Sequence, residues 1–133
     1  MTRTATLTGA DLALLTGGNY AVLVTLYEDG TPHPTVTWVD AANGRVLVNT
    51  AEGRRKDRNL LRDPRAAVTV IGEDFYRWIS IRGAAVDRVT GPEAEAHIDA
   101  LSRRYDREPW TPVAGQVRVL YRIEPQQIIR YRR

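Results

Sequence analysis

Four cations come together a few residues after a short apolar run in this chain of 133 residues. They are Arg54, Arg55, Lys56 and Arg58. Gly53, just before them, allows the chain to turn. A helix that begins near these cations would also present free backbone N–H groups, and charge combined with such donors binds phosphate and other compact polyanions. The residue types therefore predict an anion-binding loop.

Neutral donors accompany the cations. Asn49, Thr50 and Asn59 supply hydroxyl and amide groups, which a phosphate or a ribityl chain requires beside positive charge. A second interpretation is a solvated helix face, because Asp57 and Asp63 are spaced so that they could pair with arginines of the same helix. The spacing alone leaves both interpretations open.

Conventional catalytic machinery is nearly absent from the sequence. The chain has no cysteine and only two histidines. His33 lies between two prolines, which favours a turn or rim position, and His97 stands in a helical segment, which favours partial packing on a helix surface. No metal-ligand spacing, GxSxG elbow, GxGxxG loop or Walker loop occurs. We expect no catalytic side chain and no metal, so any hard chemistry would belong to a cofactor.

The cationic loop requires strands and helices to position it. The patterns predict helices over 9–15, from the cations to Pro64 and over 92–105, with Thr8 capping the first and Leu60 and Leu61 packing the second. The predicted strands cover 20–27, 35–39, 45–49, 66–71, 78–89, 118–123 and 128–131. Asn43 and Gly44 form a hairpin turn, so the first three strands are expected to pair sequentially, and Pro125 is expected to interrupt the last pair. Gly83 predicts a bend or a close approach.

The predicted fold class is mostly β. Six to seven mainly antiparallel strands with peripheral helices indicate a closed or nearly closed β-barrel, formed by residues 1–133 as a single domain. We expect a cytoplasmic protein, because the longest apolar runs are far shorter than a membrane span and the N-terminus lacks a signal-peptide core.

The net charge of +3 mildly favours an anionic partner. Nucleic acid is not the expected partner, because the aromatic residues are scattered and fit a core. The cations are also almost all arginine, which a GC-rich genome explains.

Three segments carry a resemblance to a known family. They are NTAEGRRKDRNLLRDPR at 49–65, ISIRGAAV at 79–86 and RVLYRIEP at 118–125. With the order of elements, they resemble the pyridoxamine 5′-phosphate oxidase-related split β-barrel superfamily, whose fold is like that of FMN-binding proteins. Within it the chain is most similar to the short actinobacterial deazaflavin-dependent oxidoreductases, which use coenzyme F420. The resemblance covers roughly Ala10 to the end.

The resemblance implies a homodimer with cofactor sites at the subunit interface. It places phosphate ligands at Arg55 and Lys56, a hydroxyl contact at Thr50, and a region reaching over the cofactor from the partner at 76–78. The full set of expected cofactor-binding residues is Thr35, Val36, Thr37, Asn49, Thr50, Arg54, Arg55, Lys56, Asn59, Tyr76 and Trp78.

The function implied is hydride transfer between a deazaflavin and a small organic acceptor. FMN is the alternative cofactor, and a non-catalytic carrier or sensor of the same cofactor is the alternative role. The ending QQIIRYRR has no counterpart of the substrate-binding ending of true pyridoxamine phosphate oxidases, so oxidation of that substrate is not expected.

Overall fold

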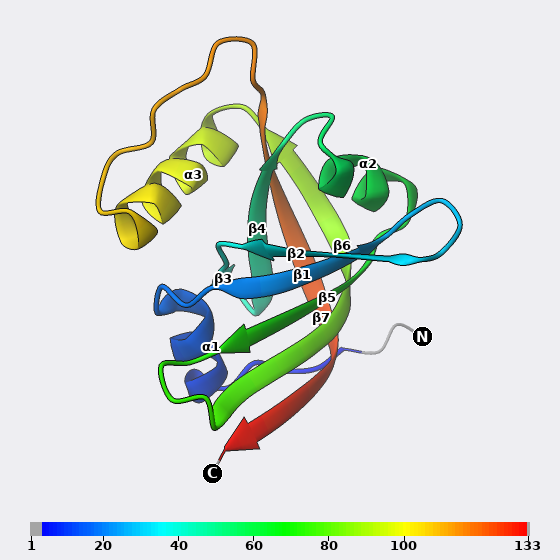
Figure 1. The fold of residues 1–133 in the computed structure, drawn as a ribbon, viewed down its shortest axis with the longest axis vertical. Coiled ribbons are helices and arrows are strands. Elements are labelled where there is room, and N and C mark those ends of the chain that lie inside the picture. The colour runs from blue at the N-terminus through cyan, green and yellow to red at the C-terminus, as the bar shows by residue number, and fades with distance from the viewer. Residues whose placement is uncertain (1–3, 133) are drawn as a thin grey trace.

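The computed structural model describes residues 4–132, which form seven strands and three helices (Figure 1). The helices are α1 (Gly9–Thr16), α2 (Arg55–Arg62) and α3 (Pro92–Tyr105). The strands are β1 (Ala21–Leu26), β2 (Pro32–Thr37), β3 (Asp40–Ala42), β4 (Arg45–Ala51), β5 (Arg65–Ile71), β6 (Arg77–Thr90) and β7 (Arg118–Arg132).

All seven strands belong to one antiparallel sheet in the order β2-β1-β5-β6-β7-β4-β3. The strands at the two ends of this order, β2 and β3, are separated in the sequence by only Trp38 and Val39. The sheet must therefore curl until its ends meet, and Figure 1 shows the chain passing from the end of β2 into β3 beside β4. This confirms the predicted mostly-β barrel of mainly antiparallel strands.

Of the predicted sequential pairing, the hairpin of the first two strands is confirmed as β1 and β2, but the pairing of the second predicted strand with the third is wrong. Asn43 and Gly44 do form a tight turn, with φ of 54° and 78°, the left-handed values of a two-residue hairpin. However, the turn joins β4 to the three-residue strand β3, and β2 pairs only with β1. Such a short strand has too few residues to show an alternating pattern.

The predicted interruption at Pro125 is also wrong, because β7 runs unbroken from Arg118 to Arg132. Pro125 lies at a register shift opposite Gly83, where Gln126 is the extra residue of a bulge. A Cβ atom on Gly83 would lie 2.1 Å from the carbonyl oxygen of Glu124, so the predicted close approach at this glycine is confirmed.

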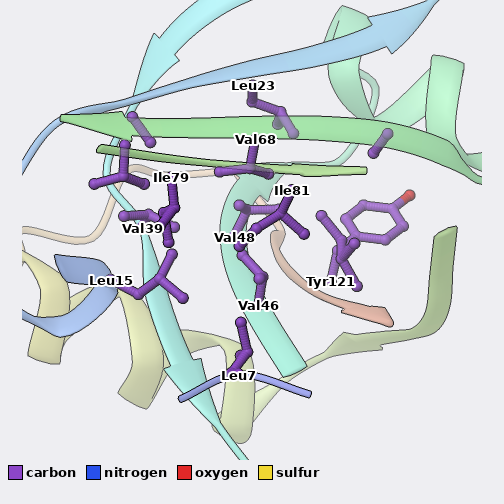
Figure 2. Packing of buried hydrophobic residues seen from close by; sticks show 14 of the residues in the cluster. Leu7, Leu15, Leu23, Val39, Val46, Val48, Val68, Ile79, Ile81 and Tyr121 are labelled. Carbon is purple, nitrogen blue, oxygen red and sulfur yellow. The ribbon is translucent and has the colours of Figure 1, made fainter. Parts of the chain in front are cut away.

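The barrel interior holds the main core, to which side chains from β1, β4, β5, β6 and β7 contribute (Figure 2). Leu15 of α1 joins this core from one end, and the Thr8 cap predicted for α1 is present as a capping box. A second, smaller cluster of Leu47, Leu120 and Ala94 packs α3 against the outer face of β4 and β7. In α2, Leu60 is buried, but Leu61 is 61% exposed and does not pack as predicted.

No helix among residues 4–132 is long and apolar enough to cross a membrane.

Candidate functional site

A pocket of about 360 Å³ lies where α2 begins, between β2, β4, the start of β7 and α3. Its lining divides into a cationic group, a polar group and an aromatic and aliphatic group. The cationic group consists of Arg54, Lys56 and Arg118, and the polar group of Asn49 and Thr37. The aromatic and aliphatic group consists of Tyr20, Val36, Trp38, Ile98, Leu101 and Trp110. A pocket that joins a cationic region to an aromatic wall suits a ligand with a flat ring system and an anionic tail.

The three cations have no carboxylate beside them in the pocket lining, and none belongs to an ion pair within residues 4–132. Burial, together with the charges of Arg54 and Arg118, lowers the pKa of Lys56. Burial and the charge of Arg54 lower the pKa of Arg118 to about 10, which leaves it protonated at neutral pH. The three positive charges therefore carry an unfavourable free energy of desolvation and mutual repulsion, which a bound anion would reduce.

Arg118 is the most buried of the three cations, with 8% of its surface exposed. It stands opposite Ala51 in the β4–β7 register, which brings the start of β7 beside the end of β4. Its Nε–H donates to Oδ1 of Asn49 at 3.0 Å, and Nη1 donates to Oε1 of Gln116 at 3.2 Å. Both acceptors are neutral amides, so the guanidinium is held in place without losing its net charge.

The aromatic wall is anchored by Tyr105 from the end of α3. Its ring stacks on Trp38 with centroids 5.2 Å apart and contacts Tyr20 edge to face at 5.4 Å. The Tyr105 hydroxyl donates to the carbonyl oxygen of Asn19 at 2.6 Å and accepts from the backbone N–H of Val39 at 3.1 Å. The wall is therefore fixed before any ligand binds.

A buried carboxylate holds α2 and the turn before it. Asp57, 1% exposed, accepts from Arg88 Nε at 3.0 Å, from the Tyr121 hydroxyl at 2.5 Å and from the backbone N–H of Gly53 at 3.0 Å. Burial alone would raise the pKa of Asp57, but these hydrogen bonds hold it below its ordinary value. Arg54, the N-cap residue of α2, makes no side-chain capping bond, so the first backbone N–H groups of this helix have no N-cap side chain as acceptor.

The helical-spacing interpretation of Asp57 and Asp63 is wrong. Asp57 pairs with Arg88 of β6, and Asp63 pairs with Arg65, which follows it by two residues. The cations Arg54 and Lys56 are consequently left without these carboxylates.

Five of the eleven residues expected in the cofactor site line the pocket: Val36, Thr37, Asn49, Arg54 and Lys56. These come from β2, β4 and the start of α2, so the structure brings together segments separated by up to 20 positions.

The other six lie outside the pocket lining. Arg55 points to the β1–β2 hairpin, where it pairs with Glu28 at 3.3 Å and lies over the ring of Tyr27. Asn59 is fully buried and donates to the Thr25 hydroxyl at 3.0 Å, a contact that joins α2 to β1; its expected cofactor role stays a prediction.

Thr35 and Thr50 carry buried hydroxyl groups with no hydrogen-bond partner within the described chain. Thr50 shares the face of β4 with Val46 and Val48, which point into the core (Figure 2). Tyr76 lies in the β5–β6 connection, and Trp78, at the start of β6, stacks on Tyr131 with centroids 5.7 Å apart. The cofactor roles of these four residues stay predictions.

Sequence reasoning missed Arg118 and the aromatic wall. Arg118 joins the cations only because β7 pairs with β4, which places Arg118 opposite Ala51, 67 positions earlier in the chain. No local spacing signals that contact. No group of three or more His, Asp or Glu side chains within residues 4–132 could hold a metal ion.

Comparisons with solved structures place the chain among split-barrel proteins. An F420 reductase is 30% identical, with a TM-score of 0.80, over 92% of this chain and 97% of its own. A conserved hypothetical protein from Mycobacterium tuberculosis is 26% identical, with a TM-score of 0.71, over 99% and 89%. General Stress Protein 26 from Bacillus anthracis is 19% identical, over 90% and 88%, and its TM-score of 0.67 shows a shared fold alone.

The family comparison covers nearly the whole chain, since the match extends over residues 7–131. It includes all three helices and the strands that surround the pocket. The chain belongs to the pyridoxamine 5′-phosphate oxidase family.

Proposed function

We propose that the pocket binds a deazaflavin of the coenzyme F420 type and that the protein is a reductase of a small organic acceptor. The observation that carries this proposal is the junction of an aromatic wall with three cations, Arg54, Lys56 and Arg118, that form no ion pair within residues 4–132. The 30% identity to an F420 reductase over almost the full length of both chains supports it.

The residues present fit such a cofactor. Exposure increases from the buried Arg118 through the half-buried Lys56 to the exposed Arg54, so positive charge extends from the pocket to its rim. An extended polyanionic tail would contact all three cations, whereas the single phosphate of FMN would contact only the inner ones. The wall of Tyr20, Trp38 and Trp110 offers apolar surface to a ring system.

When bound, the reduced cofactor supplies the hydride. The chain's own contribution is binding and orientation, because neither a carboxylate nor a histidine is among the described residues that line the pocket. Arg54, Lys56 and Arg118 hold the anionic tail, and the aromatic wall excludes water from one side of the ring.

We also propose that the protein is a homodimer, on account of an apolar outer face of the sheet. Residues of five neighbouring strands stand directly opposite one another in register and share this face. The first row consists of Val36, Val22, Thr69, Ser80 and Ile129. The second row consists of Ile71, Trp78 and Tyr131. Val36 is 68% exposed, Ile129 53% and Ile71 45%, so the face leaves apolar surface uncovered in one chain.

The position of this apolar outer face links the dimer to the pocket. Val36 belongs both to the face and to the pocket lining, so a partner seated on the face would border the pocket. The Trp78 region of that partner is then available to complete the site, in line with the expectation for Tyr76 and Trp78.

The proposal is tested by titrating the purified protein with coenzyme F420 and, separately, with FMN, following ligand fluorescence. We expect micromolar or tighter affinity for coenzyme F420 and weaker binding of FMN. Tighter binding of FMN would transfer the proposal to that cofactor, and no binding of either would refute it.

Turnover separates a reductase from a carrier. The protein loaded with reduced coenzyme F420 is mixed anaerobically with quinones and enones, and reoxidation is followed by the recovery of cofactor absorbance. Reoxidation faster than that of the free cofactor supports a reductase. Binding without any such acceleration across the acceptor panel would favour the carrier.

A further inference from the structure

A chain of hydrogen bonds runs from α3 to the pocket cation Arg118. His97 Nε2 lies 3.2 Å from Oδ2 of Asp40, and His97 Nδ1 lies 3.1 Å from Nδ2 of Asn49. Asn49 Oδ1 in turn accepts from Nε of Arg118 at 3.0 Å. The chain therefore joins Asp40, His97, Asn49 and Arg118 in that order.

The hydrogen-bonding capacities of the partners fix the direction of every bond. The Arg118 Nε–H can only donate and the Ala94 carbonyl can only accept, and the Asn49 amide meets both, its Nδ2 lying 3.0 Å from the carbonyl oxygen. The amide must therefore turn its oxygen to Arg118 and its nitrogen to His97. His97 Nδ1 must then accept, which leaves the ring proton on Nε2, from where it is donated to Asp40.

We infer that His97 is a positioning residue, which orients Asn49 and through it holds Arg118 toward the anionic ligand. This inference rests on the proposed function of the pocket. His97 itself does not line the pocket, and its side chain is 9% exposed, so it acts through its neighbours rather than by contact.

The arrangement explains how a buried guanidinium can be fixed without a carboxylate. A direct Asp or Glu partner would neutralise Arg118, whereas Asn49 orients it with a neutral oxygen. The negative charge of Asp40 is kept two side chains away, where it polarises the chain of hydrogen bonds without pairing with Arg118. Arg104 pairs with Asp40 at 2.9 Å and balances that charge on its outer side.

The first test reads the tautomer of His97 in the protein without ligand. Protein labelled with ¹⁵N-histidine is recorded by long-range ¹H–¹⁵N correlation at pH 7.5, and the two histidines are assigned with a His33→Gln variant. We expect His97 as the neutral ring protonated on Nε2. A ring protonated on Nδ1 would contradict the inferred direction and overturn the proposal.

The second test compares two substitutions that each keep one end of the ring. His97→Asn retains an acceptor near the position of Nδ1, and His97→Gln retains a polar group near that of Nε2. If His97 acts by orienting Asn49, the affinity for coenzyme F420 should decrease by no more than about twofold in His97→Asn. It should decrease by about tenfold in His97→Gln and in His97→Ala. Equal losses in all three variants, or none, would refute the positioning role.

A double-mutant comparison shows whether His97 acts through Arg118. In an Arg118→Gln background, His97→Gln should change the affinity by less than about twofold, because the group to be positioned is gone. An additive loss would overturn the proposal. His33→Gln, outside the pocket, is the matched control. If the wild-type protein binds neither coenzyme F420 nor FMN, the proposed function fails, while the tautomer measurement still decides the direction of the chain.

Discussion

At the scale of single residues, the three cations of the pocket favour ligand binding but lower the stability of the free protein. Lys56, Arg54 and Arg118 repel one another in a partly desolvated pocket, as the lowered pKa values of Lys56 and Arg118 indicate. Groups arranged for a ligand commonly destabilise the free protein, because the ligand alone relieves their unfavourable environment.

Replacing Lys56 with Met should therefore raise stability and weaken binding. Loss of one half-buried charge removes repulsion and desolvation while keeping the apolar stem, so Tm should rise by about 2–4 °C. The affinity for coenzyme F420 should fall by about tenfold or more. Calorimetry and fluorescence titration measure the two effects. Arg58→Met is the control, because Arg58 is exposed in the same helix and outside the pocket. A Lys56→Met protein with unchanged affinity would remove this residue from the site.

Asp57 predicts a pH dependence of stability. Its pKa is below the ordinary value of 3.8, so its hydrogen bonds stabilise the fold above about pH 4, and this stabilisation is lost as the pH falls through the lower folded pKa. Asp57→Asn should cost about 3 kcal/mol at pH 7, because Arg88 loses its charged partner.

The difference in unfolding free energy between wild type and Asp57→Asn should then shrink below about pH 4, as the wild-type carboxyl protonates. Urea denaturation between pH 3 and 7 measures it. Asp63→Asn is the control, since its pair with Arg65 is on the surface and should cost less than ~1 kcal/mol. A difference that stays constant with pH would show that charge is not the cause.

At the scale of elements, local patterns predicted what depends on neighbours in the sequence. The Thr8 cap and the apolar face of α3, with Ala94, Ile98 and Leu101 buried, follow from helical spacing alone. The start of α2 beside the cations was predictable for the same reason. The β1–β2 hairpin could also be predicted, but the partners of β4 could not: β3 is too short to show a pattern, and Arg118 enters the pocket only through β4–β7 pairing.

The bulge between β6 and β7 gives a prediction at this scale. A Cβ on Gly83 would lie 2.1 Å from the Glu124 carbonyl oxygen, and backbone cannot move away as a side chain can. Gly83→Ala should destabilise the protein by about 3 kcal/mol or more, measured by urea denaturation. Gly9→Ala is the control: it lies at the start of α1 with nothing within 4 Å of the added atom, and should be neutral or slightly stabilising. A tolerated Gly83→Ala would show that the bulge can relax.

At the scale of the whole molecule, the apolar outer face and the pocket together argue for two copies. A single chain leaves the row from Val36 to Ile129 uncovered, and the pocket opens beside it. The sequence could not predict this face from any one strand, because its residues come from β1, β2, β5, β6 and β7 and meet only through the register. If the partner covers the face, assembly and cofactor binding should be lost together.

Ile129→Arg tests this coupling, since it places a charge at the β7 end of the apolar outer face. Light scattering on an eluting sample should give twice the 15.0 kDa chain mass for the wild type and a single chain mass for the variant. Coenzyme F420 affinity should fall by at least tenfold in the variant, because the partner no longer borders the pocket. Val113→Arg, an equally exposed valine in the loop after α3, should remain dimeric and bind normally. A monomeric Ile129→Arg protein with full affinity would place the whole site within one chain and exclude Tyr76 and Trp78 of the partner from it.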